Sequence, residues 1–210
     1  NPKVSGKGFG QLQKAGIEVE VGLLQKRAEK INEVFIKYIR TGIPFVILKT
    51  AQTIDGYRAS ANGDSRWITG QEARLYGHKI RHKVDSILVG INTILNDNPR
   101  LTARPAEIEG IDPLRIILDP SLKIAEQAVV LNQKSKAGTL LVTGENISSS
   151  RKKLFNDKRG VEILSLPLNK KGNIPLKLLL EQLAEREISS ILVEGGGKVN
   201  HSFLNSNLVD

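Results

Sequence analysis

Short apolar runs alternate with longer amphipathic or polar stretches along most of the chain. The runs are rich in leucine and β-branched residues and are bounded by Gly, Pro, Asp or Glu, as buried strands are. They lie at 45–48, 85–90, 114–119, 139–144, 161–166 and 191–193. Strands that alternate with helices at this spacing specify a mostly parallel sheet with helices on both faces. The pattern therefore predicts an α/β fold.

Local signals predict where several helices begin. Thr69-Gly70-Gln71-Glu72 has the spacing of a capping box, with Thr69 as the cap of a helix that runs toward Lys83. Pro175 is expected at the first position of an amphipathic helix over residues 176–187. On the helix after Glu72, Arg74, His78 and Arg81 share overlapping faces. They form either a solvated basic face or a surface from which Arg81 turns inward to an anion.

The first 42 residues have a different character and are interpreted as the tail of another unit. Residues 14–22 predict a helix that ends at Gly16 and a short strand after it. Apolar residues at helical spacing predict one helix over residues 25–39. Thr41-Gly42-Ile43-Pro44 then breaks the pattern and sets a domain boundary between residues 42 and 43. Because the chain begins at Asn1 without Met, we expect a fragment of a longer protein.

A glycine turn follows the last apolar run. Glu194 ends the run, three glycines follow, and a helix is expected over residues 199–204. Backbone N–H groups at a helix N-terminus, without Cβ atoms in the way, form a cradle for phosphate. The turn matches neither GxxxxGK[ST], since Val199 follows Lys198, nor GxGxxG. On its own it is a generic anion cradle.

Other polar side chains gather where predicted strands end, the edge at which parallel sheets bind ligands. Lys49 closes the first strand. A polar loop after it contains the only tryptophan, Trp67, which as a lone Trp belongs more often to a core than to a pocket. A later loop carries Asp97, Arg100 and Arg104, which suit a phosphate and a hydroxyl.

Composition narrows the function classes. The chain has 210 residues, 40% hydrophobic and 25% charged, as in ordinary soluble globular proteins, and no apolar run near the ~20 residues that span a membrane. The net charge of +9 comes without dense basic runs, and aromatic residues are only 4%, so anionic small molecules explain the charge better than nucleic acid. We expect a cytoplasmic protein that binds neither membranes nor nucleic acid.

Metal and hydrolase chemistry lack their usual residues. The chain contains no cysteine and three histidines, without an HExxH pair or a GxSxG elbow. We therefore expect no metal site in this chain. A diphosphate cradle with polar loops at strand ends favours a dinucleotide-dependent oxidoreductase.

An ordered set of motifs then becomes specific. In chain order they are Leu48-Lys49, Thr53-Ile54-Asp55-Gly56, Gly63-Asp64-Ser65-Arg66-Trp67-Ile68-Thr69, Arg81, Ile87-Leu88-Val89-Gly90, Thr93, Asp97-Asn98-Pro99-Arg100-Leu101-Thr102-Ala103-Arg104, Ile116-Ile117-Leu118-Asp119 and Val193-Glu194-Gly195-Gly196. This set closely resembles the reductase domain of the bifunctional riboflavin-biosynthesis deaminase/reductases. Residues 1–8 and 15–19 resemble the end of the deaminase domain in the same family.

The resemblance implies a dihydrofolate-reductase-like fold and an NADPH-dependent oxidoreductase. The family reduces the ribosyl group of 5-amino-6-(5-phosphoribosylamino)uracil to the ribityl group, so the expected partner is a phosphorylated pyrimidine. Residues 1–42 would be the tail of a cytidine-deaminase-like domain, and residues 43–210 a C-terminally incomplete reductase domain. Zinc and the deaminase active site would belong to the missing upstream part of a multifunctional enzyme. We also expect a homo-oligomer, in the simplest case a dimer.

The resemblance also assigns roles to residues. Lys49 matches the catalytic lysine near the reacting carbon, where it could assist protonation as the sugar ring opens. The substrate positions are Ser65, Arg81, Leu101, Arg104 and Glu194. The cofactor positions are Gln52, Trp67, Thr93, Asp97, Pro120, Gly196, Gly197, Lys198, Val199, Asn200, His201 and Ser202. Gln52 and Pro120 depart from the family pattern, which has a small residue and Ser or Thr there.

Two alternatives stay open. One is another dihydrofolate-reductase-like reductase that acts on a pterin or a different pyrimidine; two arginines ready for a phosphate argue against an unphosphorylated pterin. The other is a noncatalytic, basic RNA-binding module. It would bind RNA with a steep salt dependence and ignore NADPH.

Overall fold

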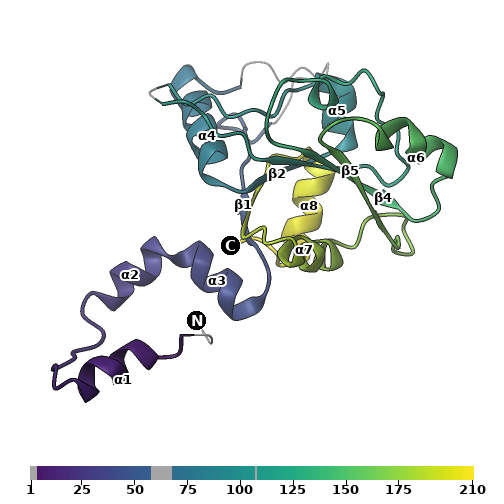
Figure 1. Ribbon diagram of the computed structural model, residues 1–210. Helices are drawn as coiled ribbons and strands as arrows, with labels where there is room; N and C mark the ends of the chain where they lie inside the picture. The colour runs from purple at the N-terminus through teal and green to yellow at the C-terminus, as the bar shows by residue number, and fades with distance from the viewer. Residues whose placement is uncertain (1–3, 58–67, 107) are drawn as a thin grey trace.

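A single parallel sheet organises the chain (Figure 1). The computed structural model describes residues 4–57, 68–106 and 108–210. The six strands pair in the order β1-β6-β2-β3-β4-β5, and every pair is parallel. They are β1 (Phe45–Leu48), β2 (Ser86–Gly90), β3 (Leu114–Leu118), β4 (Thr139–Gly144), β5 (Val161–Leu166) and β6 (Ser190–Val193). Each coincides with a predicted apolar run to within one residue, which confirms the α/β expectation.

The strands are mostly apolar because both faces of the sheet are covered, although Arg115 lies in β3 and Glu162 in β5. Successive side chains of a strand point to opposite faces. In β2, Ile87 and Val89 belong to one hydrophobic cluster, whereas Leu88 between them belongs to the other. Two separate cores therefore sandwich the sheet, as parallel sheets require.

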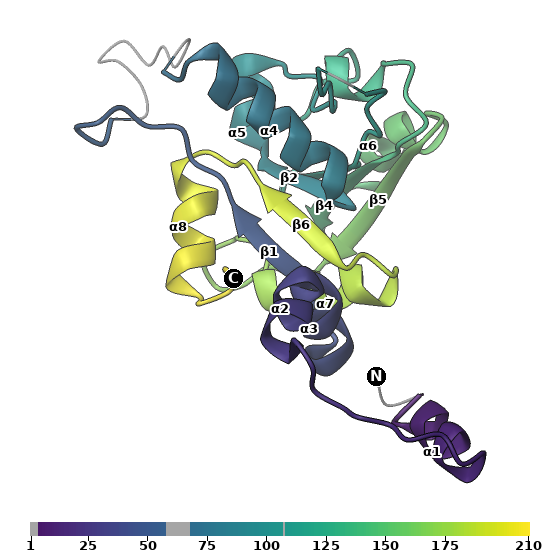
Figure 2. The same ribbon diagram turned by 90° about the vertical axis from the view of Figure 1, so that its left-hand side faces the viewer.

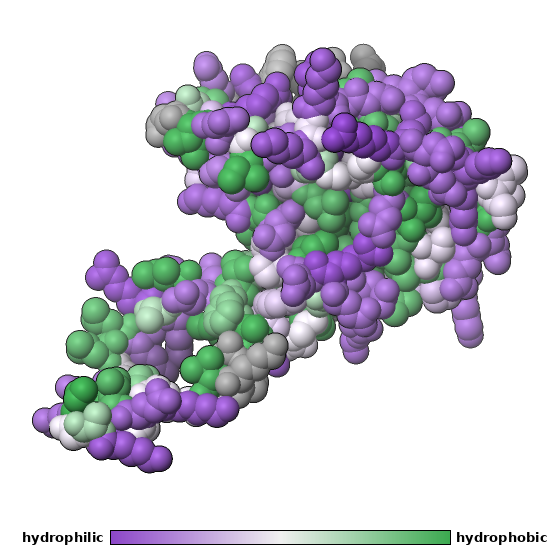
Figure 3. Space-filling model, in the orientation of Figure 1, coloured by the Kyte–Doolittle hydropathy of each residue, from purple (hydrophilic) through white to green (hydrophobic). Residues whose placement is uncertain are grey.

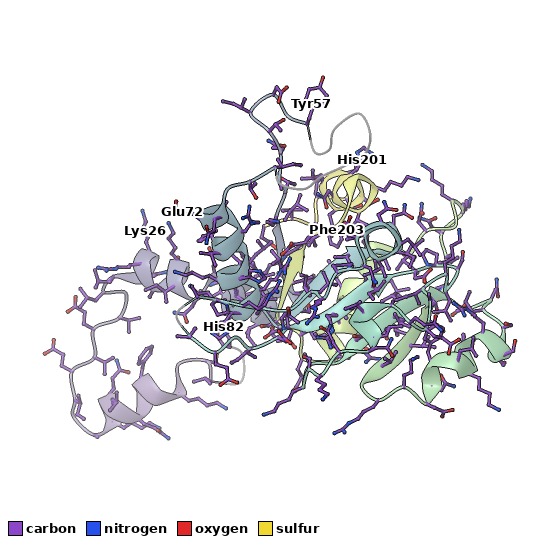
Figure 4. The ribbon with its side chains drawn as sticks, turned by 90° about the horizontal axis from the view of Figure 1, so that it is seen from above. Lys26, Tyr57, Glu72, His82, His201 and Phe203 are labelled. Atoms are coloured by element: carbon purple, nitrogen blue, oxygen red, sulfur yellow. The ribbon has the colours of Figure 1, made fainter. Side chains whose placement is uncertain are left out.

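The helices divide between the two faces (Figure 2). On one face lie α4 (Gln71–Lys83), α5 (Ile91–Asp97), the short 3₁₀ helix η1 (Val129–Leu131) and α6 (Ser149–Asn156). On the other face lie α7 (Leu176–Glu185) and α8 (Gly197–Asn205). Phe203 of α8 is fully buried against the sheet, whereas His201 is on the exposed side of the same helix (Figure 4).

A topological switch point lies between β6 and β2 at the carboxyl edge of the sheet. The neighbouring strands β6 and β2 pair directly, yet the helices that follow them, α8 and α5, cover opposite faces. The two connections therefore diverge and leave a crevice between the strand ends, where ligands of open α/β sheets bind. Glu194 and the glycine turn lie at the end of β6, and Gly90 and Thr93 lie at the end of β2.

The N-terminal segment departs from the sequence pattern. It contains α1 (Lys7–Lys14), α2 (Gln25–Ile31) and α3 (Glu33–Thr41), and residues 17–22 form no strand. The single helix expected over residues 25–39 breaks at Asn32, whose side-chain amide donates to the Ala28 carbonyl at 2.9 Å. Asparagine competes for backbone groups in this way and favours helix ends.

Apolar side chains remain exposed on this segment (Figure 3), among them Phe9, Leu23, Leu24 and Ile31.

The helix α3 contacts the sheet domain, since the Tyr38 hydroxyl donates to the Ala184 carbonyl at 2.9 Å. The C-terminal residue lies along the free edge of β1, where its Asp210 N–H donates to the Val46 carbonyl at 3.0 Å.

Two helix starts also differ from expectation. The N-cap of α4 is Gly70, without a side-chain cap, so the predicted capping box of Thr69 and Glu72 does not form. The Thr69 carbonyl instead accepts from the Arg74 guanidinium at 2.6 Å. Pro175 is the N-cap of α7 rather than its first helical residue, a difference of one position. No described helix is both long enough and apolar enough for a membrane span.

Candidate functional site

The glycine turn lets α8 approach the strand ends closely. A Cβ atom on Gly195 would lie 2.6 Å from the Val199 Cβ, and one on Gly90 would lie 2.8 Å from the Val199 Cγ2. No side chain fits at either position unless α8 moves. Val199 therefore fixes the start of α8 against β6 and β2. Although Val199 is one of the predicted cofactor positions, its side chain packs against the backbone of Gly195 and Gly90.

Gly196 differs from its neighbour because it faces open space. The nearest heavy atom to a Cβ built on Gly196 is Thr93 Oγ1, at 3.9 Å. Two predicted cofactor positions, Gly196 and Thr93, thus lie next to each other between the ends of β6 and β2. The first N–H groups of α8 have no intrahelical acceptors and carry the positive end of the helix dipole, so the space suits an anion.

Asn200 adds a buried acceptor beside the turn. The residue is 4% exposed, and its Oδ1 has no hydrogen-bond partner in the described part of the chain. A Cβ on Gly195 would lie 3.3 Å from this oxygen, so the oxygen faces the turn. Buried polar atoms normally have partners. A ligand hydroxyl or amide would supply the missing donor.

Three charged side chains meet at the carboxyl end of β6. Arg81 of α4 donates to Glu194 through two bonds of 2.8 Å, from Nε to Oε1 and from Nη2 to Oε2. The Lys49 Nζ lies 3.4 Å from Oε2. Of the two interpretations of this helix face, a solvated basic face or Arg81 turned inward to an anion, the second holds for Arg81, and the anion is a carboxylate of the protein itself. The cluster thus joins three predicted site residues from β1, α4 and β6.

The carboxylate of this cluster is ionised despite its burial. The Glu194 side chain is 9% exposed, while that of Lys49 is 36% exposed. Burial alone would raise the pKa of Glu194, but the hydrogen bonds and charge of Arg81, with the charge of Lys49, outweigh it and hold the pKa below its ordinary value. The site therefore presents a fixed negative charge next to a partly exposed ammonium group.

This depressed pKa makes stability depend on pH. Because Glu194 is ionised more readily when folded than when unfolded, its contribution is present above its ordinary value of 4.5 and disappears as pH falls through the lower folded value. We expect wild type to exceed Glu194→Gln in melting temperature at pH 7, and this difference to shrink progressively below pH 4.5. Calorimetric melting of both proteins across this range checks the prediction. A difference that is constant with pH would contradict it.

The loop after α5 follows a constrained path beside the cluster. Asn98 and Leu101 have positive φ angles of 42° and 54°, and Leu101 is 4% exposed. The Thr102 carbonyl accepts from Arg81 Nη1 at 3.1 Å. The amide of Ala103 donates to the Asp112 carboxylate at 2.8 Å. The Arg104 side chain at the end of the loop is exposed and forms no ion pair with other described residues.

His78 is a functional candidate that the sequence pattern placed only on the basic face of its helix. His78 Nδ1 lies 3.2 Å from both the Arg104 amide nitrogen and the Thr102 oxygen. The one available signal was its spacing of three residues from Arg81, which places both side chains on the same face of α4.

The remaining predicted cofactor positions are spread along the same edge of the sheet. Gln52 is exposed in the loop after β1, Asp97 is the exposed last residue of α5, and Pro120 follows β3. Gly197, Lys198, His201 and Ser202 lie on α8, with His201 Nε2 2.8 Å from Asn205 Nδ2. Ser65 and Trp67 fall outside the described residues. Within the described ranges, no group of three His, Asp or Glu residues is arranged to hold a metal.

Comparisons with known proteins find relatives that match the whole chain. RibD of Aquifex aeolicus, a riboflavin biosynthesis protein, is 40% identical over 210 residues, which are 100% of this chain and 56% of that protein. The structure of Acinetobacter baumannii RibD has a TM-score of 0.81 at 32% identity and covers 98% of this chain and 55% of the other.

A third relative is described by its chemistry. It is the diaminohydroxyphosphoribosylaminopyrimidine deaminase/5-amino-6-(5-phosphoribosylamino)uracil reductase of Thermotoga maritima, with a TM-score of 0.77, 37% identity, and coverage of 98% of this chain and 54% of that one. The chain thus spans little more than half the length of these relatives. Residues 44–210 match the family described as the RibD C-terminal domain. This chain therefore belongs to the RibD C-terminal domain family of riboflavin biosynthesis proteins.

Proposed function

We propose that this chain carries an NADPH-dependent reductase of riboflavin biosynthesis. Its substrate is 5-amino-6-(5-phosphoribosylamino)uracil, and its product carries a ribityl group in place of the ribosyl group. The observation that supports this most is the position of the Glu194 cluster, directly beside the glycine turn at one switch point. The reductase named among the relatives supports the substrate.

The residues at the switch point fit a dinucleotide. Gly196 and the first turn of α8 would hold the diphosphate, with the Thr93 hydroxyl next to Gly196. The unpartnered Oδ1 of Asn200 would accept from a cofactor hydroxyl or amide. When bound, the nicotinamide supplies a hydride for carbon 1′ of the sugar.

The charged cluster would hold and protonate the substrate. Glu194 accepts hydrogen bonds from the donor groups of the aminopyrimidine or from sugar hydroxyls, and Arg81 keeps its carboxylate ionised and oriented. Lys49, held near Glu194 but partly exposed, donates a proton to the ring oxygen as the bond between that oxygen and carbon 1′ breaks. Since Arg81 is already paired with Glu194, the exposed Arg104 is the better ligand for the substrate phosphate.

The division of the chain is also part of the proposal. Residues 43–210 form the reductase domain, and residues 1–42 belong to the end of a neighbouring deaminase-type domain. The exposed apolar side chains of α1 and α2 support this, because such surface is normally covered by other protein.

The functional test uses the full-length chain and measures NADPH oxidation with and without the phosphoribosylamino uracil. We expect oxidation only when this compound is present, and faster with NADPH than with NADH. Failure of the compound to stimulate oxidation, together with salt-dependent RNA binding, would support the noncatalytic alternative.

The phosphate role of Arg104 can be separated from cofactor binding. Arg104→Ala should raise the KM for the substrate about 10- to 100-fold, the effect of losing a charge-assisted hydrogen bond, and leave the Kd for NADPH unchanged. Arg159→Ala is the control, since Arg159 is an exposed arginine between α6 and β5, at the amino end of that strand and away from the carboxyl edge of the sheet. Equal losses of affinity for substrate and NADPH in Arg104→Ala would refute this assignment.

A further inference from the structure

His78 contacts the backbone of the loop that carries Arg104. It lies on α4, one turn before Arg81, and is partly buried. Its Nδ1 is 3.2 Å from the Arg104 amide nitrogen and 3.2 Å from the Thr102 carbonyl oxygen. A single ring nitrogen has either a lone pair or a proton, so it cannot serve both groups at once.

The other bonds of the loop decide between these two partners. Arg81 Nη1 already donates to the Thr102 carbonyl at 3.1 Å. The Arg104 N–H has only His78 Nδ1 as an acceptor within the described ranges. Burial lowers the pKa of His78, and the positive charges of Arg81 and Arg104 lower it further. A neutral ring with its proton on Nε2 leaves Nδ1 free to accept from Arg104.

We propose that His78 is a positioning residue for substrate binding: its neutral Nδ1 holds the Arg104 amide and thereby aims the Arg104 side chain at the substrate phosphate. This inference rests on the proposed function for the identity of the ligand. The bond between His78 and the loop can be measured without any ligand.

The loop needs such an anchor because parts of its backbone are strained. Asn98 is the left-handed C-cap of α5, which suits Asn, but Leu101 adopts a left-handed conformation that such side chains rarely take and that persists only where surrounding contacts enforce it. Arg81 fixes Thr102, Asp112 fixes Ala103, and His78 fixes Arg104. The exposed Arg104 side chain forms no ion pair with other described residues, so its direction depends on the backbone that His78 holds.

The chain offers a matched control on the same helix. His82, one turn after His78, also accepts a backbone amide at Nδ1, that of Ile111 at 3.0 Å (Figure 4). It holds the Ile111 amide, which lies in the same connection between α5 and β3 but is not the Arg104 amide. Its removal therefore reproduces the loss of a histidine anchor from α4 without touching the Arg104 amide.

Three variants of the full-length protein test the proposal. His78→Leu removes the acceptor at similar size and should raise the KM for the phosphoribosylamino uracil about tenfold, the value of one hydrogen bond, with kcat and the Kd for NADPH unchanged. His78→Asn places an amide oxygen near the position of Nδ1 and should restore the KM to within about threefold of wild type. His82→Leu should leave the KM unchanged.

The pH dependence gives a second readout. The charged groups that face His78 are Arg81 on its own helix, Arg104 on the loop and Glu194 on β6. Protonation below the lowered pKa of His78 removes the acceptor, so the wild-type KM should rise as pH falls below 6.5. His78→Asn has no imidazole to protonate. Dividing the wild-type KM by the KM of His78→Asn at each pH therefore removes the effect of the substrate phosphate, whose titration is the same with both proteins.

Amide hydrogen exchange of the ligand-free proteins separates this proposal from the proposed function. Exchange at Arg104 should accelerate at least tenfold in His78→Leu but not in His82→Leu, where Ile111 responds instead. An unchanged Arg104 rate in His78→Leu would overturn the proposal, as would an equal rise in KM in His82→Leu. If wild type fails to reduce the substrate while Arg104 exchange responds as expected, the proposed function fails and the anchoring by His78 stands.

Discussion

Glu194→Gln is expected to lower kcat/KM for the substrate by about 100-fold or more. The substitution keeps the shape of the side chain but removes the charge that Arg81 and Lys49 share. Loss of one partner from a largely buried, hydrogen-bonded charge pair costs about 2–5 kcal/mol, because the other charge is left without compensation. The proposal also makes Glu194 a direct acceptor for substrate donors, so binding and orientation should both suffer. Steady-state kinetics of the full-length enzyme measure the effect.

Glu162→Gln is the matched control for this substitution. Glu162 on β5 forms an ion pair of 2.7 Å with Arg186, and its side chain is 59% exposed. Exposed pairs of this kind contribute little. We expect wild-type kcat/KM in this variant. Comparable activity in Glu194→Gln and wild type would remove Glu194 from the site.

Gly196→Val should abolish cofactor binding without unfolding the protein. The backbone of Gly196 has φ −68° and ψ 176°, which any L-residue adopts, and a Cβ there meets only open space and Thr93 Oγ1. The valine side chain would occupy the space assigned to the diphosphate. We expect the Kd for NADPH, measured by calorimetry, to rise about 100-fold or more while the melting temperature stays near that of wild type.

Gly195→Ala tests the neighbouring glycine and should lower the melting temperature, which Gly196→Val should not. Its new Cβ would lie 2.6 Å from the Val199 Cβ, so α8 must shift, which typically costs about 1–3 kcal/mol. This variant should melt at a clearly lower temperature. Undiminished NADPH affinity in Gly196→Val would contradict the placement of the cofactor.

The strands were predictable from sequence because the sheet is covered on both faces, so most positions of each strand are apolar. Their order was not, since nothing in the local pattern of Ser190–Val193 says that it lies between β1 and β2. The strand expected at residues 17–22 does not form for a related reason: a strand needs a partner, and none of the described strands pairs with this segment. The predicted capping box does not form, because Thr69 matches the motif in sequence but Gly70 is the N-cap of α4 in the structure.

The site could be predicted as a set of residues but not as a set of contacts. The resemblance assigned Arg81 and Glu194 separately to the substrate, and their bond joins residues 113 positions apart in sequence. Sequence spacing also could not distinguish Gly195, which gives Val199 room, from Gly196, which faces the crevice. The contact between His78 and Arg104 depends on the path of a loop with left-handed residues at Asn98 and Leu101, which no local propensity predicts.

The central claim is that the Glu194 cluster and the glycine turn hold the two reactants of one reduction. Mass spectrometry of the product formed with NADPH that carries two deuterium atoms at nicotinamide carbon 4 tests this most directly. The full-length enzyme should yield a ribityl product with one deuterium at carbon 1′, whichever face of the nicotinamide is used. A ribityl product without deuterium, or cofactor oxidation without this product, would contradict the claim.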